Sequence, residues 1–438
     1  MHFVNRVNEL KTLTATLQRS KQNAQFTLVT GRRRVGKTAL LLEHLKGIEG
    51  KTLYLYVARK SETLLVVDFQ QAAEAELGLK IFGTLTSFSD YFEQLLIYAQ
   101  QEHLTLVLDE FQDFDRVNKS IFGSIQNLWD RYKDSAHINL IVSGSIYALM
   151  VKLFEDDKEP LFGRLTSKLI LQPFTTEIIK SVLYDYNPTC NSEDLLFLYA
   201  LSGGSPRYLA LLIDAEATDR ASMLSYIASN GSPFLSDGKD ILVSEFGKDY
   251  ATYFSILQLI ASGKTSQSAI DLIIGKTTGA YLQNLEKDYS LIAPQRPLFA
   301  KPQSRTVKWR IIDRYLVFWF RFVFANQGLI EMGRFDLLQQ SIEQHYSTFS
   351  GLALEDYFRA KLAEEGRYTR IGASWDNKGL AEIDILALND LDKTALVAEV
   401  KRNAKKINLA ALRVKADSLT NELAAYEVSY QGFSMADM

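Results

Sequence analysis

The sequence contains little cysteine, histidine and proline, and it has no long run of apolar residues. Cys190 is the one cysteine among 438 residues, so no disulfide can form within the chain, and we expect a reducing, cytoplasmic environment. The five histidines have no ligand spacing, which argues against a structural zinc site. The most apolar stretch, Tyr315–Ala325, is too short to span a bilayer and contains Arg321, and Met1–Lys11 lacks the apolar core of a signal peptide. We therefore expect neither a membrane span nor a signal peptide.

The chain also lacks a large excess of charge of either sign. It has 49 Lys and Arg residues and 52 Asp and Glu residues, a net charge of −3. Any affinity for nucleic acid therefore has to come from a local basic surface. Hydrophobic residues make up 47% and charged residues 23%, which excludes a disordered chain, and the length suggests about three domains.

Short apolar runs alternate with helical patterns in the first third of the chain. The runs that we expect to be strands are Phe26–Thr30, Thr52–Val57, Leu104–Leu108, Ile138–Val142 and Lys168–Leu171. Nearly continuous apolar strands separated by helices are typical of a parallel sheet that is buried on both faces. We therefore predict an α/β domain here.

The first strand runs into a glycine-rich segment that matches the pattern G-x-x-x-x-G-K-[ST]. Its residues are Gly31, Arg32, Arg33, Arg34, Val35, Gly36, Lys37 and Thr38, and a helical pattern follows. The glycines allow the backbone N–H groups to face the phosphates of a nucleotide at the start of a helix. We expect Lys37 to reach the β- and γ-phosphates and the Thr38 hydroxyl to bind Mg²⁺.

A pair of acidic residues follows the strand Leu104–Leu108. On its own such a pair is as often a solvated strand end, but ligands of α/β sheets bind at the carboxyl ends of the strands. We expect Asp109 to hold Mg²⁺ through water and Glu110 to orient and deprotonate the attacking water. Because Glu110 directly follows Asp109, hydrolysis is favoured over transfer of the phosphoryl group to an acceptor.

Weaker signals belong to the same candidate site. Ser143 or Ser145, at the end of a predicted strand, could touch the γ-phosphate or the lytic water. Arg164 and Arg207 follow glycine-containing turns, and either could act as an arginine finger or nucleotide sensor. Residues 3–10 could cap the adenine side. The alternatives are surface arginines, turns and an ordinary first helix.

Residues 250–325 carry ten basic and four acidic residues, a local balance of +6. Three helical patterns and two short strand patterns in this segment predict a winged helix, with a recognition helix over Thr277–Asn284. The wing would carry Lys301, Arg305 and Lys308 toward the DNA backbone. A winged helix that contacts only proteins is the alternative.

The last hundred residues contain carboxylates at a spacing that is typical of metal-dependent nucleases. Asp384 and Glu399 lie on two predicted neighbouring strands, and Glu399 and Lys401 point to the same face. Glu355, on the preceding predicted helix, would complete a Mg²⁺ site in which Lys401 assists attack by water. Residues 401–415 contain six basic and no acidic residues and could grip phosphates. Solvated polar positions around a small sheet are the alternative.

The ordered motifs GRRRVGKT, LDE, SGS, PLFGR and GGSPRYL resemble those of the archaeal-type P-loop ATPases, relatives of the AAA+ and STAND ATPases. The tail resembles the module fused to them, a winged helix that here ends KWRIIDRYLVFWFRF and a PD-(D/E)xK restriction-endonuclease-like domain with GLALEDYF, EIDIL and AEVKRN. The resemblance implies ATP as the nucleotide and hydrolysis coupled to DNA or to a regulatory assembly. Ile383 replaces the proline before Asp384, a departure from the nuclease pattern.

We thus predict a multidomain chain: a P-loop ATPase core of ASCE/AAA+-like α/β fold (1–174), a helical lid (175–244), a winged helix (245–328) and an α/β nuclease-like domain (329–438). The functional hypothesis is an ATPase that couples its nucleotide state to DNA binding or Mg²⁺-dependent DNA cleavage. The alternative is a slow regulatory switch that binds DNA or a protein without cutting. The sequence is compatible with a homo-oligomer and does not define its size.

Overall fold

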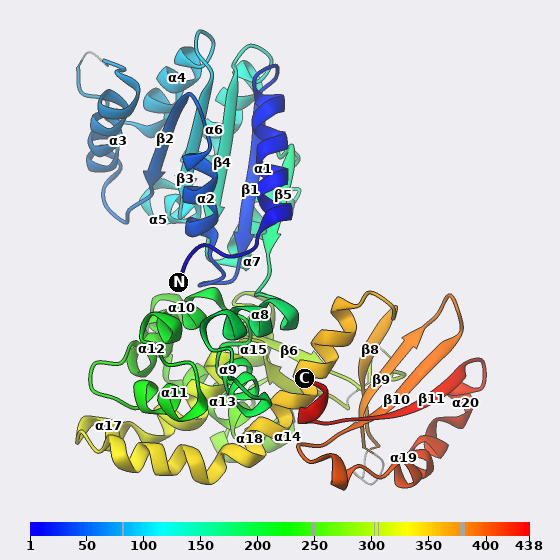
Figure 1. Ribbon diagram of the computed structural model, residues 1–438. Helices are drawn as coiled ribbons and strands as arrows, with labels where there is room; N and C mark the ends of the chain where they lie inside the picture. Colours follow the sequence, from blue (N-terminus) through cyan, green and yellow to red (C-terminus); the bar gives the residue numbers. More distant parts are fainter. Residues whose placement is uncertain (81–82, 247–249, 302, 305, 377–381) are drawn as a thin grey trace. The chain divides into compact units, whose positions relative to one another are not determined.

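The computed structural model describes residues 1–438 with the exception of 81–82, 247–249, 302, 305 and 377–381 (Figure 1). Arg305 of the predicted wing lies outside the described residues. The chain divides into two compact units, residues 2–172 and residues 173–438, the latter grouped with Met1. We call them the first and the second unit. The three domains expected after residue 174 share the second unit.

The described part of the first unit contains a five-stranded sheet in which all neighbours are parallel, in the order β2-β3-β4-β1-β5. Its strands are β1 (Gln25–Gly31), β2 (Lys51–Tyr56), β3 (Leu104–Asp109), β4 (Ile138–Gly144) and β5 (Ser167–Leu171). All five predicted strands are confirmed. β1, β3 and β4 are buried along their whole length, because helices cover both faces of the sheet.

The helices of the first unit form two layers (Figure 1). They are α1 (Val7–Ser20), α2 (Lys37–Lys46), α3 (Glu62–Leu77), α4 (Phe88–Tyr98), α5 (Phe114–Asn118), α6 (Ile121–Tyr132) and α7 (Tyr147–Glu155). Leu13 of α1 and Leu40 of α2 pack on one face of the sheet, against Val29. Aromatic side chains such as Phe92 and Phe122 of α4 and α6 pack on the other face. This double cover leaves the carboxyl ends of the strands as the edge where a site can form.

The second unit begins with the predicted helical segment. Its helices are α8 (Thr176–Tyr186), α9 (Ser192–Ser202), α10 (Pro206–Asp214), α11 (Arg220–Ile227) and α12 (Pro233–Phe246). The predicted break at Ser202–Pro206 separates α9 from α10. Gly204 in this break has φ +83°, and a Cβ there would come within 2.3 Å of the Phe174 carbonyl oxygen. The turn therefore requires glycine.

Three helices and a pair of short strands follow along the chain. They are α13 (Tyr250–Ala261), α14 (Gln267–Ile274), α15 (Gly279–Lys287) and the antiparallel strands β6 (Ile292–Gln295) and β7 (Lys308–Ile311). The elements agree with the predicted order of three helices and two strands. The segment after β6 docks on the last sheet, since Leu298 N–H donates to the Ala373 carbonyl oxygen at 3.0 Å.

Aromatic side chains then connect this segment to a long helix. After α16 (Arg314–Phe318) the chain runs through a π-helical turn, Trp319–Val323, to α17 (Gln327–Glu331) and α18 (Phe335–Glu364). The expected connector near 330–350 and the helix 351–365 are one continuous helix of 30 residues. Phe349 of α18 packs edge-on against the Phe322 ring. The predicted domain boundary at residue 328 thus precedes a helix that packs both on the aromatic segment and on the last sheet.

Within the described residues, the last sheet has four strands in the order β11-β10-β9-β8. They are β8 (Arg370–Ser374), β9 (Ile383–Asn389), β10 (Thr394–Val400) and β11 (Glu427–Phe433). α19 (Leu409–Ala416) and α20 (Thr420–Leu423) cover one face. A 3₁₀ turn at Asp417–Leu419 separates α19 from α20, although the helical pattern of the sequence runs from Leu409 to Leu423 without a break, and β11 was not predicted.

No helix in the described part of the chain is both long and apolar enough to cross a membrane.

The packing of α12 on the aromatic segment gives a prediction. A Cβ on Gly238 would come within 2.3 Å of the Trp319 indole, so Gly238→Ala should lower the free energy of unfolding of the second unit by about 1–3 kcal/mol. Urea unfolding followed by tryptophan fluorescence measures it. Gly351→Ala, in α18 with no atom within 4 Å of the added Cβ, should instead stabilise by up to about 1 kcal/mol. Equal stabilities for the two variants would contradict the packing described here.

Candidate functional site

The segment Gly31–Thr38 forms a tight loop between β1 and α2. Gly31 has φ +147°, and a Cβ there would lie 2.6 Å from the Leu171 carbonyl oxygen, so only glycine fits beside β5. Gly36 has φ +89° and caps α2, and Arg34 also takes a positive φ of 72°. These left-handed residues curl the backbone around the start of α2, where N–H groups and the helix dipole favour an anion.

The Lys37 ammonium is held at the mouth of this loop. Its Nζ donates to the carbonyl oxygens of Gly31 at 2.9 Å and Arg32 at 3.0 Å. Burial lowers the pKa of Lys37 to about 8, although Glu110 and Asp109 oppose this shift. Lys37 is therefore mainly protonated at neutral pH and carries its charge where phosphate oxygens would be bound.

Asp109 lies at the end of β3, where its buried carboxylate accepts hydrogen bonds from three neighbouring elements. The Thr38 hydroxyl donates to Oδ2 at 3.1 Å and the Ser143 hydroxyl to Oδ1 at 2.7 Å. The Tyr54 hydroxyl of β2 also donates to Oδ2. Burial and the contact with Asp109 raise the pKa of Tyr54, so this hydroxyl remains a donor. The carboxylate is thereby fixed next to the threonine of the loop.

Glu110 has φ 53°, a left-handed conformation that is rare for glutamate, at the sharp turn after β3. Its Oε2 accepts a hydrogen bond from the Ser145 hydroxyl at 2.7 Å and another from the Gln112 side-chain amide. Ser143 and Ser145, one of which we expect to touch the γ-phosphate or the lytic water, thus both bind the acidic pair in this structure, and that role stays a prediction.

Tyr54 and Gln112 are site residues that the sequence reasoning missed. Tyr54 and Tyr56 alternate with leucines along β2, a pattern that marks one face of a strand. The pattern does not reveal that β2 is the neighbour of β3. This pairing sets Tyr56 opposite Asp109 in the sheet and brings Tyr54 within reach of the Asp109 carboxylate. Gln112 lies in a 3₁₀ turn, Phe111–Asp113, that has no sequence signal of its own.

Arginines surround the loop. The buried Nη1 of Arg32 has no hydrogen-bond partner among the described residues, which is unfavourable unless an anion binds there. Arg6, in the segment predicted to cap the adenine side, donates through Nη2 to the carbonyl oxygens of Val35 at 3.0 Å and Gln172 at 2.7 Å. The first residues of the chain are therefore anchored on the loop.

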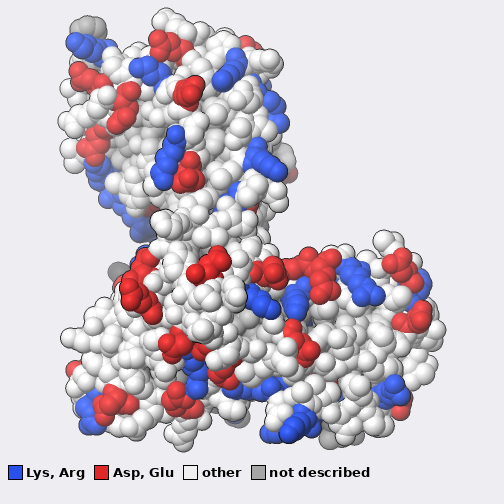
Figure 2. Space-filling model, in the orientation of Figure 1, with Lys and Arg blue, Asp and Glu red and all other residues white. Residues whose placement is uncertain are grey.

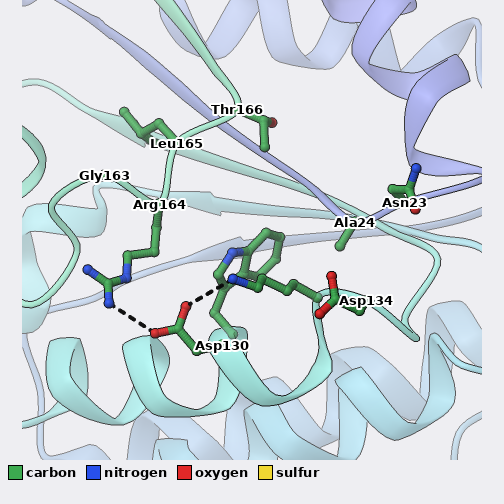
Figure 3. Close-up of a pocket in the computed structure, with 10 residues that line it drawn as sticks. Asn23, Ala24, Asp130, Asp134, Gly163, Arg164, Leu165 and Thr166 are labelled. Carbon is green, nitrogen blue, oxygen red and sulfur yellow. Dashed lines mark hydrogen bonds and ion pairs between the residues drawn. The ribbon is translucent and has the colours of Figure 1, made fainter.

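Of the two candidate finger arginines, Arg164 belongs to the first unit and lies away from this loop, and Arg207 belongs to the second unit. Arg164 precedes β5, at the amino ends of the strands and thus at the opposite edge of the sheet. Figure 3 shows it pointing toward Asp130, to which it donates at 3.0 Å, in a pocket beside Asn23. Arg207 belongs to the second unit, where its Nε lies 3.8 Å from an Asp237 oxygen. The finger and sensor roles of both arginines stay predictions.

The residues at the loop fit a nucleotide with Mg²⁺ on three observations. A lysine ammonium, a buried arginine donor without a partner among the described residues, and a curled loop at a helix start suit phosphates. A threonine hydroxyl and a carboxylate stand 3.1 Å apart, and both are oxygen ligands of the kind Mg²⁺ prefers. An acidic side chain, Glu110, follows directly.

A second group of predicted residues comes together in the second unit. β9 and β10 are antiparallel, and the Lys401 ammonium lies 3.2 Å from Asp384 Oδ2 and 3.4 Å from Glu399 Oε1. Burial opposes the charge of Lys401, but the two carboxylates outweigh it and raise its pKa. Lys415, from the predicted basic run 401–415, lies 3.7 Å from Glu399 Oε1.

The expected metal site is not assembled from these carboxylates. Among the described residues, no three His, Cys, Asp or Glu side chains are grouped closely enough to hold a metal ion. The physical reason is that cations already bind the expected ligands. The Lys401 ammonium contacts both Asp384 and Glu399, and Arg359 lies 3.5 Å from Glu355 Oε2. The geometry therefore does not fit the predicted three-carboxylate Mg²⁺ site.

Comparison with known proteins gives matches to two families, and one of them covers the loop site. Residues 3–212 match the model of a family described as an ATPase domain predominantly from Archaea. Residues 319–412 match a second model, described as archaeal and bacterial proteins of unknown function. The protein is also similar to the uncharacterized protein MJECL04 of Methanocaldococcus jannaschii, with 28% identity over 428 residues, 92% of this chain and 90% of that one.

Two solved structures have a similar fold. The Walker-type ATPase of Pyrococcus abyssi matches with a TM-score of 0.53 and 20% identity, over 73% of this chain and 96% of that one. The Aeropyrum pernix ORC2 protein, solved as ADPNP–ADP complexes, matches with a TM-score of 0.51 and 15% identity, over 75% and 95%. At these identities the likeness is one of fold, and it agrees with the five-stranded parallel α/β sheet of the first unit. The residues that match the ATPase-domain model include the whole of the loop site described above.

The hydrogen bonds of Asp109 give a prediction for the first unit. Tyr54→Phe removes one donor to a buried carboxylate and should lower the free energy of unfolding by roughly 1–3 kcal/mol. Tyr56→Phe is the matched control, because Tyr56 lies on the same strand and is 58% exposed. Calorimetry of the two full-length variants measures the difference. An unchanged unfolding temperature for Tyr54→Phe would rule out a contribution of this hydrogen bond.

Proposed function

We propose that the protein binds ATP with Mg²⁺ at Gly31–Thr38, hydrolyses it with Asp109 and Glu110, and couples its nucleotide state to nucleic-acid binding by the second unit. The observation that carries the first part is the convergence of Lys37, Thr38 and Asp109 at the carboxyl ends of β1 and β3. Coupling to nucleic-acid binding is the second part of this proposal, and hydrolysis does not depend on it.

Each residue at the loop has a role that its chemistry supports. The backbone N–H groups and the Lys37 ammonium would bind the β- and γ-phosphates and stabilise the charge that develops on the transferred phosphoryl group. Mg²⁺, held by the Thr38 hydroxyl and through water by Asp109, would supply further neutralisation of phosphate charge. Tyr54 and Ser143 would keep the Asp109 carboxylate oriented. Arg32 would add a donor to a phosphate oxygen.

Glu110 would act as the general base for water. Its Oε2 accepts hydrogen bonds from the Ser145 hydroxyl and the Gln112 side-chain amide, and these donors occupy the oxygen that would take a proton from water. Hydrolysis would therefore require that Glu110 leave these donors. This arrangement supports slow turnover, as expected of a regulatory switch.

The second unit would bind nucleic acid. The support comes from the +6 balance of residues 250–325, from the winged-helix order of α13, α14, α15, β6 and β7, and from the basic residues of 401–415. In this proposal residues 175–244 form the helical lid, residues 245–328 the winged helix and residues 329–438 the nuclease-like domain. Lys301, an exposed wing residue, and Lys264 remain available for phosphate contacts.

DNA cleavage is a second candidate function. The observation in its favour is that the Lys401 ammonium lies within 3.4 Å of both the Asp384 and the Glu399 carboxylate. The absence of a three-ligand group among the described residues favours binding without cutting. We therefore prefer nucleic-acid binding to DNA cleavage as the function of this site.

Removal of the phosphate-binding charge should abolish hydrolysis. Lys37→Ala is expected to lower ATP turnover by at least about 10²-fold, because a buried cation at the transferring group is lost. Glu110→Gln should retain nucleotide binding and lose turnover to a similar extent. Phosphate release is the measurement. Lys46→Ala, on the exposed side of the same helix, is the control. Full activity of Lys37→Ala would refute the site.

The cleavage candidate predicts nicking of plasmid DNA with Mg²⁺ or Mn²⁺. Nicking should disappear in Asp384→Ala and Lys401→Ala, while ATP hydrolysis continues in both variants. Glu422→Ala, an exposed change on α20, should leave nicking unchanged. If the wild-type protein leaves the plasmid intact with every divalent metal, the protein binds nucleic acid without cutting it.

A further inference from the structure

A cavity of about 380 Å³ lies within the second unit, between the wing and the last sheet. The wing strand β7 contributes Lys308, Trp309 and Arg310, and α16 contributes Arg314. α18 contributes Glu355, Asp356 and Arg359, and β9 contributes Asp384. Elements from both predicted nucleic-acid-binding parts therefore meet in one cavity.

The cavity wall contains more positive than negative charge around Asp356. This one carboxylate faces three guanidinium groups: Arg359 Nη2 lies 2.8 Å from Oδ1, Arg314 Nη1 lies 2.5 Å from Oδ2, and Arg310 Nη1 lies 3.7 Å from Oδ1. Burial opposes ionisation of Asp356, but the arginines outweigh it and lower its pKa to about 2.

Several donors of these arginines are unsatisfied. The Nε and Nη2 atoms of Arg314 and the Nε atom of Arg359 are buried and have no hydrogen-bond partner among the described residues. Buried donors of this kind are rare in folded proteins, because each loses its bond to water. An anion with several acceptor oxygens, such as a phosphate, would satisfy guanidinium groups in this geometry.

Two indole rings lie beside the arginines. Trp309 and Trp375 both line the cavity, and the Lys308 ammonium lies 4.4 Å from the centre of the Trp375 ring. Lys308 also donates to Glu382 at 2.8 Å. Aromatic faces next to cations are how single-stranded nucleic acids are bound, with bases on the rings and phosphates on the cations.

The size of the cavity indicates whether it would bind a duplex or a single strand. A volume of about 380 Å³ is at the lower end of small-ligand pockets, which run from about 300 to 1,000 Å³. A duplex cannot enter, and a base reaches such a pocket only from a single strand or after leaving the stack. On the face drawn in Figure 2, basic and acidic side chains are interspersed rather than gathered into one broad basic surface. A local pocket therefore suits this protein better than a wide duplex-binding face.

We propose that this cavity binds one nucleotide of a single-stranded nucleic acid, with its phosphate on Arg310 and Arg314 and its base on Trp309. The inference rests on the proposed nucleic-acid binding by the second unit and deepens it to a single-stranded substrate. Asp384 lies in the wall of the same cavity, so the bound strand passes the Asp384–Lys401 pair.

Binding of a fluorescein-labelled 20-nucleotide single-stranded DNA to the full chain tests the proposal. Fluorescence anisotropy is recorded at several salt concentrations in EDTA, which prevents cleavage, and the same strand is also tested after annealing to its complement. The wild-type protein should bind the single strand at least about 10-fold more tightly than the duplex. Unlabelled thymidine 5′-monophosphate should compete only at far higher concentration than an unlabelled strand.

Three variants locate the site. Arg310→Gln should weaken binding of the single strand about 5- to 20-fold and reduce the salt slope by roughly 0.7, the value for one phosphate contact on a single strand. Trp309→Leu should weaken binding about 5-fold or more without changing the salt slope. Arg334→Gln is the matched control, because Arg334 and Arg310 are each 51% exposed and Arg334 does not line the cavity.

The outcomes separate the two proposals. If the wild-type protein binds no nucleic acid, the proposed function of the second unit fails, and an acidic protein segment becomes the ligand to test. If it binds but Arg310→Gln and Trp309→Leu behave like Arg334→Gln, or the duplex is preferred, only the cavity assignment is overturned. Strong competition by the free mononucleotide would overturn the assignment to a strand in favour of a small-nucleotide site.

Discussion

The buried carboxylate of Asp109 is the constraint on which the first unit depends. It is 3% exposed at the end of a fully buried strand, and it is held by hydroxyl groups from the loop helix, from β2 and from β4. A buried charge is tolerated only where such donors surround it. The same donors fix the carboxylate beside Thr38, while burial and the loop carbonyls hold the Lys37 ammonium at the loop mouth. The arrangement of the sheet thus places opposite charges around the space where phosphates and Mg²⁺ would bind.

A comparable electrostatic constraint organises the second unit. Asp356 of α18 binds arginines from β7, α16 and its own helix, and the segment after β6 is hydrogen-bonded to β8. The strand pair β6–β7, which we predicted to be a wing, therefore forms part of the wall of a cavity that Asp384 also lines. Part of the positive balance counted in residues 250–325 is neutralised by acidic residues that lie later in the chain.

The sequence predicts the first unit well, because its signals are local. Apolar runs mark the five strands, and the loop pattern follows one of them directly, so the positions of Lys37 and Asp109 could be expected. Tyr54 and Gln112 were missed because their roles depend on which strands are neighbours and on a short turn. The continuity of α18 and the strand β11 were missed for a similar reason, since both depend on packing against elements distant in sequence. The spacing of Asp384 and Glu399 along the chain does not reveal that Lys401 contacts both of them, and the role of these residues in a metal site stays a prediction.

The most direct measurement is a crystal structure of the full chain with Mg²⁺ and a nonhydrolysable ATP analogue. We expect the β- and γ-phosphates to lie on the N–H groups of residues 31–38, with Lys37 Nζ turned from the loop carbonyls onto phosphate oxygens and the metal between Thr38 and the water-linked Asp109. A nucleotide bound elsewhere, or a loop whose Lys37 and Asp109 make no contact with the phosphates and metal, would contradict the assignment of this site.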